Sequence, residues 1–243
     1  MGSILQRKIL LPKRSAIGKI GLLSLLQTVL QYLFFYIGLA HTTGVKASII
    51  EAVSTFVAIL VAGYLFHQET VTSRKMLGCL IGFAGVVLVN VAGSGMDFHF
   101  SPAGDGCILL STVAYAFSSV CMKRFSQKED PVMLSGYQFI LGGIVMIACG
   151  AAMGGHLKAF TASAAALLIY MAMISAVAYS LWGMLLKYNP VSKVTVFGFM
   201  NPVIGVILSA LLLNETESLG VSSVLALGLV CVGIYIVNAK DKD

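Results

Sequence analysis

The sequence has few charged residues, and this scarcity excludes a water-soluble globular domain. Only 11% of its 243 residues are charged, whereas soluble domains contain about 25%. Hydrophobic residues make up 58% of the chain, and the mean hydropathy is +0.93. A chain this apolar cannot cover its surface with polar side chains, so we expect a lipid bilayer to surround most of it.

The sequence also lacks the motifs of common enzymes and metal sites. Its five cysteines and four histidines form no CxxC, Cys/His or HExxH pattern. There is no GxSxG elbow and no GxxxxGK[ST] phosphate loop. We therefore expect no metal, no cofactor and no enzymatic activity. The net charge of +6 is spread between apolar runs, which argues against a nucleic-acid partner.

What the sequence has instead is a series of long apolar runs. A membrane-spanning helix needs about 20 mainly apolar residues. Eight runs qualify, and they are Ile20–Ala40, Ala47–Phe66, Met76–Val91, Cys107–Met122, Val132–Met153, Ala164–Leu186, Val194–Leu213 and Leu219–Val237. The sequence therefore predicts an all-α polytopic membrane protein with eight transmembrane helices.

The basic residues predict the orientation of these helices. If the N-terminus is cytoplasmic, fourteen of the sixteen Lys and Arg residues fall on the cytoplasmic side, and only Lys46 and Lys158 fall outside. This bias follows the positive-inside rule. It predicts a basic cytoplasmic segment at residues 1–19, a cytoplasmic tail at 239–243 and insertion in a bacterial-type inner (plasma) membrane.

The chain contains a weak internal repeat, of residues 20–92 against residues 103–238. Tyr32 aligns with Tyr179, and Lys46 aligns with Lys193. After a one-residue gap, Gln68-Glu69-Thr70 aligns with Asn214-Glu215-Thr216. The two copies cross the membrane in opposite directions, and such inverted repeats are typical of secondary transporters. Chance similarity between apolar helices is the alternative explanation.

The second copy has two helices, Cys107–Met122 and Val132–Met153, that have no counterpart before the first copy. A symmetric parent would contain ten helices in two sets of five. Our hypothesis is that the first two helices are missing through a shortened gene model, an internal start or truncation. A genuine eight-helix protein is the alternative.

The segments Ala40–Thr72 and Asn189–Leu219, with the Gly-rich helix Gly78–Asn90, carry a family resemblance. The pattern resembles the EamA-type transporters of the drug/metabolite transporter superfamily, over nearly the whole chain. The resemblance implies an inner-membrane carrier of ten helices in two inverted five-helix repeats. It also implies export of amino acids or other small metabolites.

Several polar residues lie inside the predicted helices. Polar side chains within a membrane are energetically costly, so each of these residues calls for a functional or structural explanation. Glu51 is the only acidic residue within a predicted span. It is either a proton or cation carrier, or an interfacial residue paired with Lys46. Asn201-Pro202, flanked by Gly198 and Gly205, should bend its helix because Pro202 crowds the carbonyl of Gly198. The bend is either a hinge or substrate contact, or a purely structural kink.

Three helices carry polar and aromatic stripes that suit a cavity for an amphipathic or zwitterionic solute. Helix–helix hydrogen bonding is the alternative role. The residues of the predicted substrate or ion pathway are Gln27, Gln31, Tyr32, Glu51, Ser54, Ser111, Tyr115, Ser118, Ser175, Tyr179, Trp182, Gly198, Asn201 and Pro202.

These observations predict a secondary carrier that moves a small solute by alternating access. A channel-like pore, an intramembrane enzyme and a transport-incompetent or partner-requiring subunit are the alternatives. The sequence has no ring of like charges, which a pore would use. It also has no paired nucleophile and base, which an intramembrane enzyme would need. Gly78 and Gly82 form a close-packing motif, used either inside the bundle or in a homodimer.

Overall fold

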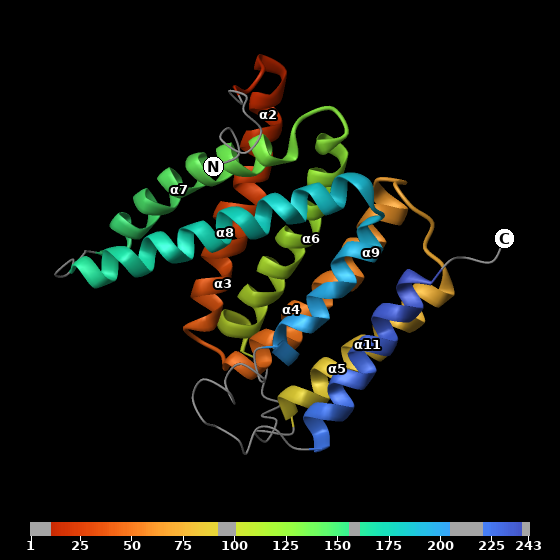
Figure 1. Cartoon of the computed structure of the whole chain (residues 1–243). Coiled ribbons are helices and arrows are strands. Elements are labelled where there is room, and N and C mark those ends of the chain that lie inside the picture. The colour runs from red at the N-terminus through yellow and green to blue at the C-terminus, as the bar shows by residue number, and fades with distance from the viewer. Residues whose placement is uncertain (1–10, 92–100, 156–160, 205–220, 240–243) are drawn as a thin grey trace. The chain divides into compact units, whose positions relative to one another are not determined.

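The computed structural model describes residues 11–91, 101–155, 161–204 and 221–239, and every regular element in these ranges is a helix (Figure 1). Five helices are long and apolar enough to cross a membrane, and they are Arg14–Leu39, Lys46–Leu65, Pro102–Ser126, Pro131–Ala152 and Ala162–Tyr188. Val191–Ile204 and Val224–Asn238 are shorter apolar helices. The predicted class, an all-α polytopic membrane protein, is confirmed, and the exact number of spans stays a prediction.

The first three predicted helices are present, two of them with π-helical turns. Their elements are α2 (Arg14–Leu23), a π-helix (Ser24–Leu30) and α3 (Gln31–Leu39), then α4 (Gly44–Leu60) with a π-helix (Val61–Leu65), then α5 (Ser73–Val91). The side chain of Thr43 caps α4 by accepting a bond from the N–H of Lys46 at 3.3 Å. Such a cap satisfies a backbone donor at the start of a helix.

The described elements of the second half of the chain are also helices. Its elements are a π-helix (Pro102–Gly106), α6 (Cys107–Ser126), α7 (Pro131–Ala152), α8 (Ala162–Tyr188), α9 (Val191–Thr195), a 3-10 helix (Val196–Phe199) and α11 (Val221–Asn238). Asp130 caps α7 and Pro131 occupies its first turn, a typical helix start. The predictions about Gly205, Leu213, Asn214-Glu215-Thr216 and Leu219 lie outside the described residues.

The early start at Pro102 corrects one prediction. The candidate span Pro102–Ser126 contains Asp105, so Glu51 is not the only acidic residue within a span. The sequence did not indicate this early start, because Pro102 and four other small or polar residues precede Cys107. Proline nevertheless suits the first turn of a helix, where no internal N–H bond is needed.

The chain forms two compact units, and each contains helices from both predicted copies of the repeat. The first unit comprises Met1–Leu33 and Cys121–Tyr188, and the second comprises Phe34–Val120 and Asn189–Asp243. The pair α4 and α9, which the predicted repeat would align, lies within the second unit, as does the pair α5 and α11. The aligned residues Tyr32 and Tyr179 both belong to the first unit.

Close packing of α5 on α11 forms much of the core of the second unit (Figure 1). A Cβ atom on Gly233 would lie 2.6 Å from the carbonyl oxygen of Gly78 and 2.6 Å from the nitrogen of Gly82. The ring of Phe199 lies against Gly82 on another side. Small residues let helix backbones approach closely within a membrane. The Gly78 and Gly82 motif is thus used inside this unit.

Helices α4 and α6 run in the same direction within the second unit. Hydrogen bonds join Thr42 to Asp105 near their starts and Gln68 to Val120 near their ends, the latter at 3.2 Å. Between these levels the hydroxyl of Thr112 donates to the carbonyl of Ile50 at 3.5 Å. Because α4 and α6 are parallel, the intervening α5 must return in the opposite direction, as alternating membrane crossings require.

In the first unit, α7 packs against the π-helical turn Ser24–Leu30 and against α8. Gly142 provides the close approach, because a Cβ there would overlap the side chain of Thr28. At the start of α7, an ion pair of 2.7 Å joins Lys19 to Glu129. These contacts place α2 and α7 side by side with their starts together.

Candidate functional site

A pair of buried amides lies between two apolar helices of the first unit. The Nε2 of Gln138 on α7 donates to the Oε1 of Gln27 at 2.9 Å. Their exposed fractions are 0% and 2%. Buried polar groups are costly unless they are hydrogen-bonded, and polar residues within membranes usually mark functional positions. This pair is therefore the starting point for a candidate site.

Two more buried polar side chains lie on the same helix as Gln27. Thr28 and Gln31 are 4% and 9% exposed. Among the described residues, no group bonds to the Oγ1 of Thr28 or to the Oε1 atoms of Gln31 and Gln138. Each of these oxygens can accept a hydrogen bond. The helix pair thus offers acceptors to a polar solute or to water.

Two tyrosines extend this polar strip. The hydroxyls of Tyr32 and Tyr179 lie 2.8 Å apart, and the Tyr179 ring packs edge-on against Phe139 with centroids 4.7 Å apart. The hydroxyl of Ser135 donates to the backbone carbonyl of Tyr179 at 3.3 Å. We call the strip the polar seam, and its members are Gln27, Thr28, Gln31, Tyr32, Ser135, Gln138 and Tyr179.

The stripes predicted on α6 and α8 are only partly buried. On α6, Ser111 and Ser118 are buried and Tyr115 is half-buried, but the Ser118 hydroxyl bonds to the carbonyl of Tyr115 in its own helix at 2.8 Å. On α8, Ser175 is exposed and Trp182 is half-buried. The structure brings Gln27, Gln31, Tyr32 and Tyr179 together in one seam, whereas Ser111, Tyr115 and Ser118 belong to the second unit.

Glu51 lies on the exposed side of α4, and Ser54 is half-buried on the same helix. Glu51 has no hydrogen-bond or ion-pair partner among the described residues, so the predicted pairing with Lys46 is wrong. The Nζ of Lys46 instead lies 3.9 Å from a carboxylate oxygen of Asp105. Asp105 also accepts bonds from the Thr42 hydroxyl and, at 2.9 Å, from the N–H of Ser101.

The predicted bend near Asn201-Pro202 stays a prediction, but the helix changes form just before these residues. Helix α9 changes to a 3-10 helix over Val196–Phe199, which includes Gly198. Asn201 is exposed and Pro202 is half-buried. The Thr55 hydroxyl on α4 donates to the carbonyl of Thr195 at 3.1 Å, at the junction between the two helical forms. This contact fixes the junction against α4.

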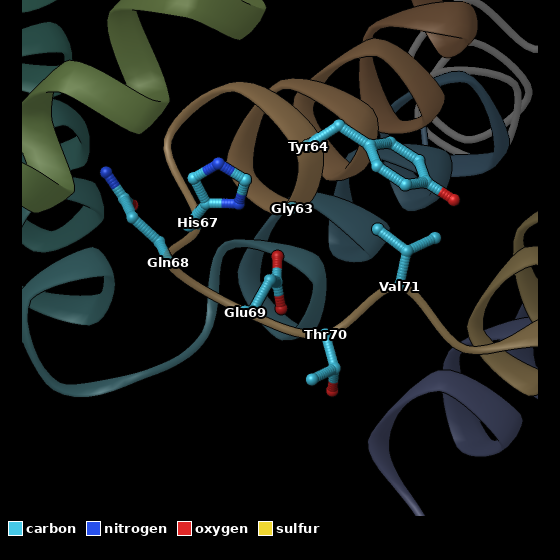
Figure 2. A pocket seen from close by; sticks show the side chains of 7 residues that line it. All are labelled: Gly63, Tyr64, His67, Gln68, Glu69, Thr70 and Val71. Atoms are coloured by element: carbon cyan, nitrogen blue, oxygen red, sulfur yellow. The ribbon is translucent and has the colours of Figure 1, made fainter.

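A second polar site lies where α4 ends and the chain turns toward α5. Figure 2 shows a pocket of about 580 Å³, lined by Gly63, Tyr64, His67, Gln68, Glu69, Thr70 and Val71. The side chains of Gln68, Glu69 and Thr70 point in three different directions from the loop. Gly63 is needed here because a Cβ would overlap the side chain of Val71. The loop therefore folds back onto the last turn of α4.

Glu69 holds this loop to the beginning of α9. One carboxylate oxygen accepts the backbone N–H of Ser192 at 2.9 Å, and the other accepts the Ser192 hydroxyl at 2.5 Å. Lys75 of α5 forms an ion pair with the same carboxylate at 3.1 Å. All three side chains are more than nine-tenths buried. We call this group the Glu69 junction.

Sequence reasoning missed several of these residues. Gln138 is a lone amide in an apolar helix, and that isolation was a usable signal. Glu69 was noticed only as punctuation of the repeat, and nothing in the sequence indicated its partner Ser192. Among the described residues, no group of three His, Cys, Asp or Glu side chains has a metal-binding arrangement.

The fold and the polar seam define a polytopic membrane protein with polar groups buried between its helices. The chain belongs to the EamA-like transporter family, which matches residues 2–91 and 102–239. The family is one of transporters and not of enzymes, and two of the relatives below are named as transporters. Transport of a small solute across a bilayer is thus the function of this class of protein.

Related proteins come from plants and bacteria. A chloroplastic WAT1-related protein of Arabidopsis thaliana is 27% identical over 85% of this chain and 51% of its own length, so the chain spans about half of that relative. The uncharacterized transporter YvbV of Bacillus subtilis is 27% identical over 90% of this chain and 71% of its own. The uncharacterized inner membrane transporter YedA of Escherichia coli is 29% identical over 82% and 65%.

A solved crystal structure has the same fold. It superposes with a TM-score of 0.80 and covers 97% of this chain and 82% of its own. Its sequence identity to this chain is 18%, so the likeness concerns the fold alone.

Proposed function

We propose that this protein is a secondary carrier that exports a small metabolite, an amino acid or a related solute, by alternating access through a central cavity. The observation that carries the proposal is the polar seam. It combines Tyr32 and Tyr179, the aligned residues of the two repeat copies, with a buried amide pair. Secondary transporters bind their solutes near the membrane midplane, at the interface between repeats.

The chemistry of the seam favours a neutral or zwitterionic solute with both polar and apolar parts. The seam offers amide and hydroxyl groups and tyrosine rings but no charged side chain. A net charge on the solute would then be left without a partner in a medium where unpaired charges are costly. Aromatic rings beside a few placed polar groups are typical of small-molecule sites.

We further propose that the chain lies in an inner (plasma) membrane with both ends in the cytoplasm. The distribution of basic residues supports this orientation. The Escherichia coli relative YedA is named as an inner membrane transporter. Under this orientation the Glu69 junction faces the cytoplasm and Asp105 faces outward.

Proton coupling through Glu51 is a separate part of the proposal. Its carboxylate is the one acidic group of α4, and it has no hydrogen-bond or ion-pair partner among the described residues, so no ion pair fixes its charge. Glu51→Gln should then abolish acceleration of transport by an imposed pH gradient and leave gradient-free exchange intact. Unchanged acceleration would exclude Glu51 as the coupling group.

The experiment that tests the seam measures flux of radiolabelled amino acids, tried one at a time, in proteoliposomes containing the purified chain. Gln138→Leu should abolish the flux, because it removes a buried partner of Gln27. Gln127→Leu is the matched control, since Gln127 is exposed and bonds only to backbone carbonyls at 3.3 and 2.9 Å. Equal flux in both variants would show that the polar seam is not part of the transport pathway.

A further inference from the structure

The loop between α4 and α5 is connected to three other helices through its side chains. Gln68 donates to the carbonyl of Val120 on α6 at 3.2 Å. Glu69 accepts two bonds from Ser192 on α9, and Lys75 on α5 donates to the carbonyl of Thr70 at 2.8 Å. Any movement of this loop therefore changes how α5, α6 and α9 are held at this end.

Helix α9 depends on Glu69 for its first turn. Its N-cap residue is Pro190, which makes no side-chain capping bond. The carboxylate of Glu69, 123 residues away in the chain, accepts the N–H of Ser192 instead. A carboxylate at a helix N-terminus satisfies an unpaired backbone donor and interacts favourably with the helix dipole. The cap is thus supplied by a neighbouring loop and is lost when the two separate.

If Ser192 separated from Glu69, the buried carboxylate of Glu69 would still have a partner. Lys75 is six residues from Glu69 and holds the same carboxylate by an ion pair of 3.1 Å. If Ser192 moved away, Glu69 and Lys75 would remain together on one short segment of chain. Leaving one member of a buried pair without its partner is strongly unfavourable, and this arrangement avoids that cost. The bonds to Ser192 are therefore suited to reversible breakage.

The loop also contains backbone strain and has space beside it. His67 adopts a φ of 49°, a left-handed conformation that is uncommon for residues other than glycine. The pocket of Figure 2 borders the same loop. Strained residues often occur in segments that switch between two arrangements. An alternative loop conformation would relieve the strain at His67 and has room to form.

We propose that the bonds between Glu69 and Ser192 break and re-form in each transport cycle, so that the Glu69 junction acts as a gate at the cytoplasmic end of the second unit. This inference rests on the proposed carrier function. When the junction is open, the first turn of α9 loses its cap and is free to reorient at the 3-10 segment Val196–Phe199. Hinges at the ends of elements commonly absorb such changes.

Thiol labelling tests the proposal without any transported solute. Ser192→Cys replaces a side chain that is 0% exposed and keeps Glu69 and Lys75 in place. Inside-out membrane vesicles holding the full chain are treated with a membrane-impermeant maleimide, and labelling is followed at each cysteine by mass spectrometry. Ser126→Cys is the matched control, because Ser126 is also 0% exposed at the same predicted side and bonds only within its own helix. Native Cys79, 0% exposed, is the internal control.

The expected result is slow but measurable labelling of the Ser192→Cys thiol. An open state populated at roughly 0.1–10% would label it at about that fraction of the rate for the exposed position Thr70→Cys. The Ser126→Cys thiol and Cys79 should stay unlabelled. Adding Glu69→Gln should raise the Ser192→Cys rate roughly tenfold, because a carboxylate forms bonds about twice as strong as those of a neutral group.

Two results would overturn the proposal. One is a Ser192→Cys thiol as unreactive as Cys79, which would show that the junction stays closed and has only a structural role. The other is solute counterflow that continues after the Ser192→Cys thiol has been modified, since a blocked gate must stop transport. Absence of transport by the unmodified protein would instead refute the carrier function, and the labelling rates would still decide whether the junction opens.

Discussion

The hydroxyl groups of Tyr32 and Tyr179 lie 2.8 Å apart, although 147 residues separate them in the chain. The two residues were paired first by alignment of the weak internal repeat. In an inverted repeat, residues near the symmetry axis meet their own counterparts. Their contact is consistent with the predicted repeat, because it joins two positions that the alignment equates.

Removing either tyrosine hydroxyl should impair transport. Tyr32→Phe and Tyr179→Phe keep the rings and remove the bond between them, so we expect each to lower the transport rate roughly tenfold, the loss of about 1.4 kcal/mol. The double variant should be little worse than either single one, because residues in direct contact are not additive. Initial rates in proteoliposomes measure this, and additive losses would show that the two hydroxyls act separately.

Variants of Gln27 and Gln138 distinguish a structural role of the amide pair from a role in transport. Gln138→Leu leaves the amide of Gln27 buried without its partner, which should destabilise the protein by about 1–3 kcal/mol. The double variant Gln27→Leu/Gln138→Leu should recover most of that stability, because replacing both partners by apolar groups can be nearly neutral. Thermal unfolding in detergent measures the recovery. Transport should stay absent in the double variant, and restored transport would mean that the pair only supports the fold.

The sequence was most informative about periodic and compositional features. Apolar runs predicted where the helices lie. Pro202 directed attention to the stretch around Gly198, because a proline ring acts on its own helix; the structure has a 3-10 segment there, and the bend itself stays a prediction. Contacts between distant segments were harder to predict. Glu51 was chosen because it lies within an apolar run, whereas the well-bonded carboxylates, Glu69 and Asp105, lie at helix ends. Their partners are set by tertiary packing, which no local pattern encodes.

Because α5 packs closely on α11, replacing two different glycines of α11 by alanine should affect stability differently. Gly233→Ala would place a Cβ 2.6 Å from backbone atoms of Gly78 and Gly82, and backbone cannot move aside easily. We expect destabilisation of roughly 1–3 kcal/mol. Gly228→Ala is the matched control, because its Cβ would meet nothing within 4 Å and alanine favours helix. Equal unfolding temperatures for the two variants would contradict the packing described here.

The break at Pro202 should matter more for transport than for folding. Pro202→Ala restores a backbone N–H and removes the ring that crowds the Gly198 carbonyl, so the 3-10 segment should straighten into regular α-helix. We expect expression and unfolding temperature to change little while the transport rate falls. Parallel measurement of membrane abundance and transport per molecule checks this. A proportional loss of both quantities would identify the break as purely structural.

The central claim is that this chain carries a solute by alternating access, and counterflow tests it most directly. Proteoliposomes containing the purified protein are loaded with one unlabelled amino acid, diluted into a trace of the same labelled compound, and followed over time, for each amino acid in turn. For at least one of them we expect a transient accumulation of label that saturates with solute concentration and disappears in Gln138→Leu. Label that only equilibrates, at a rate proportional to concentration, would indicate a channel-like pore and would contradict the claim.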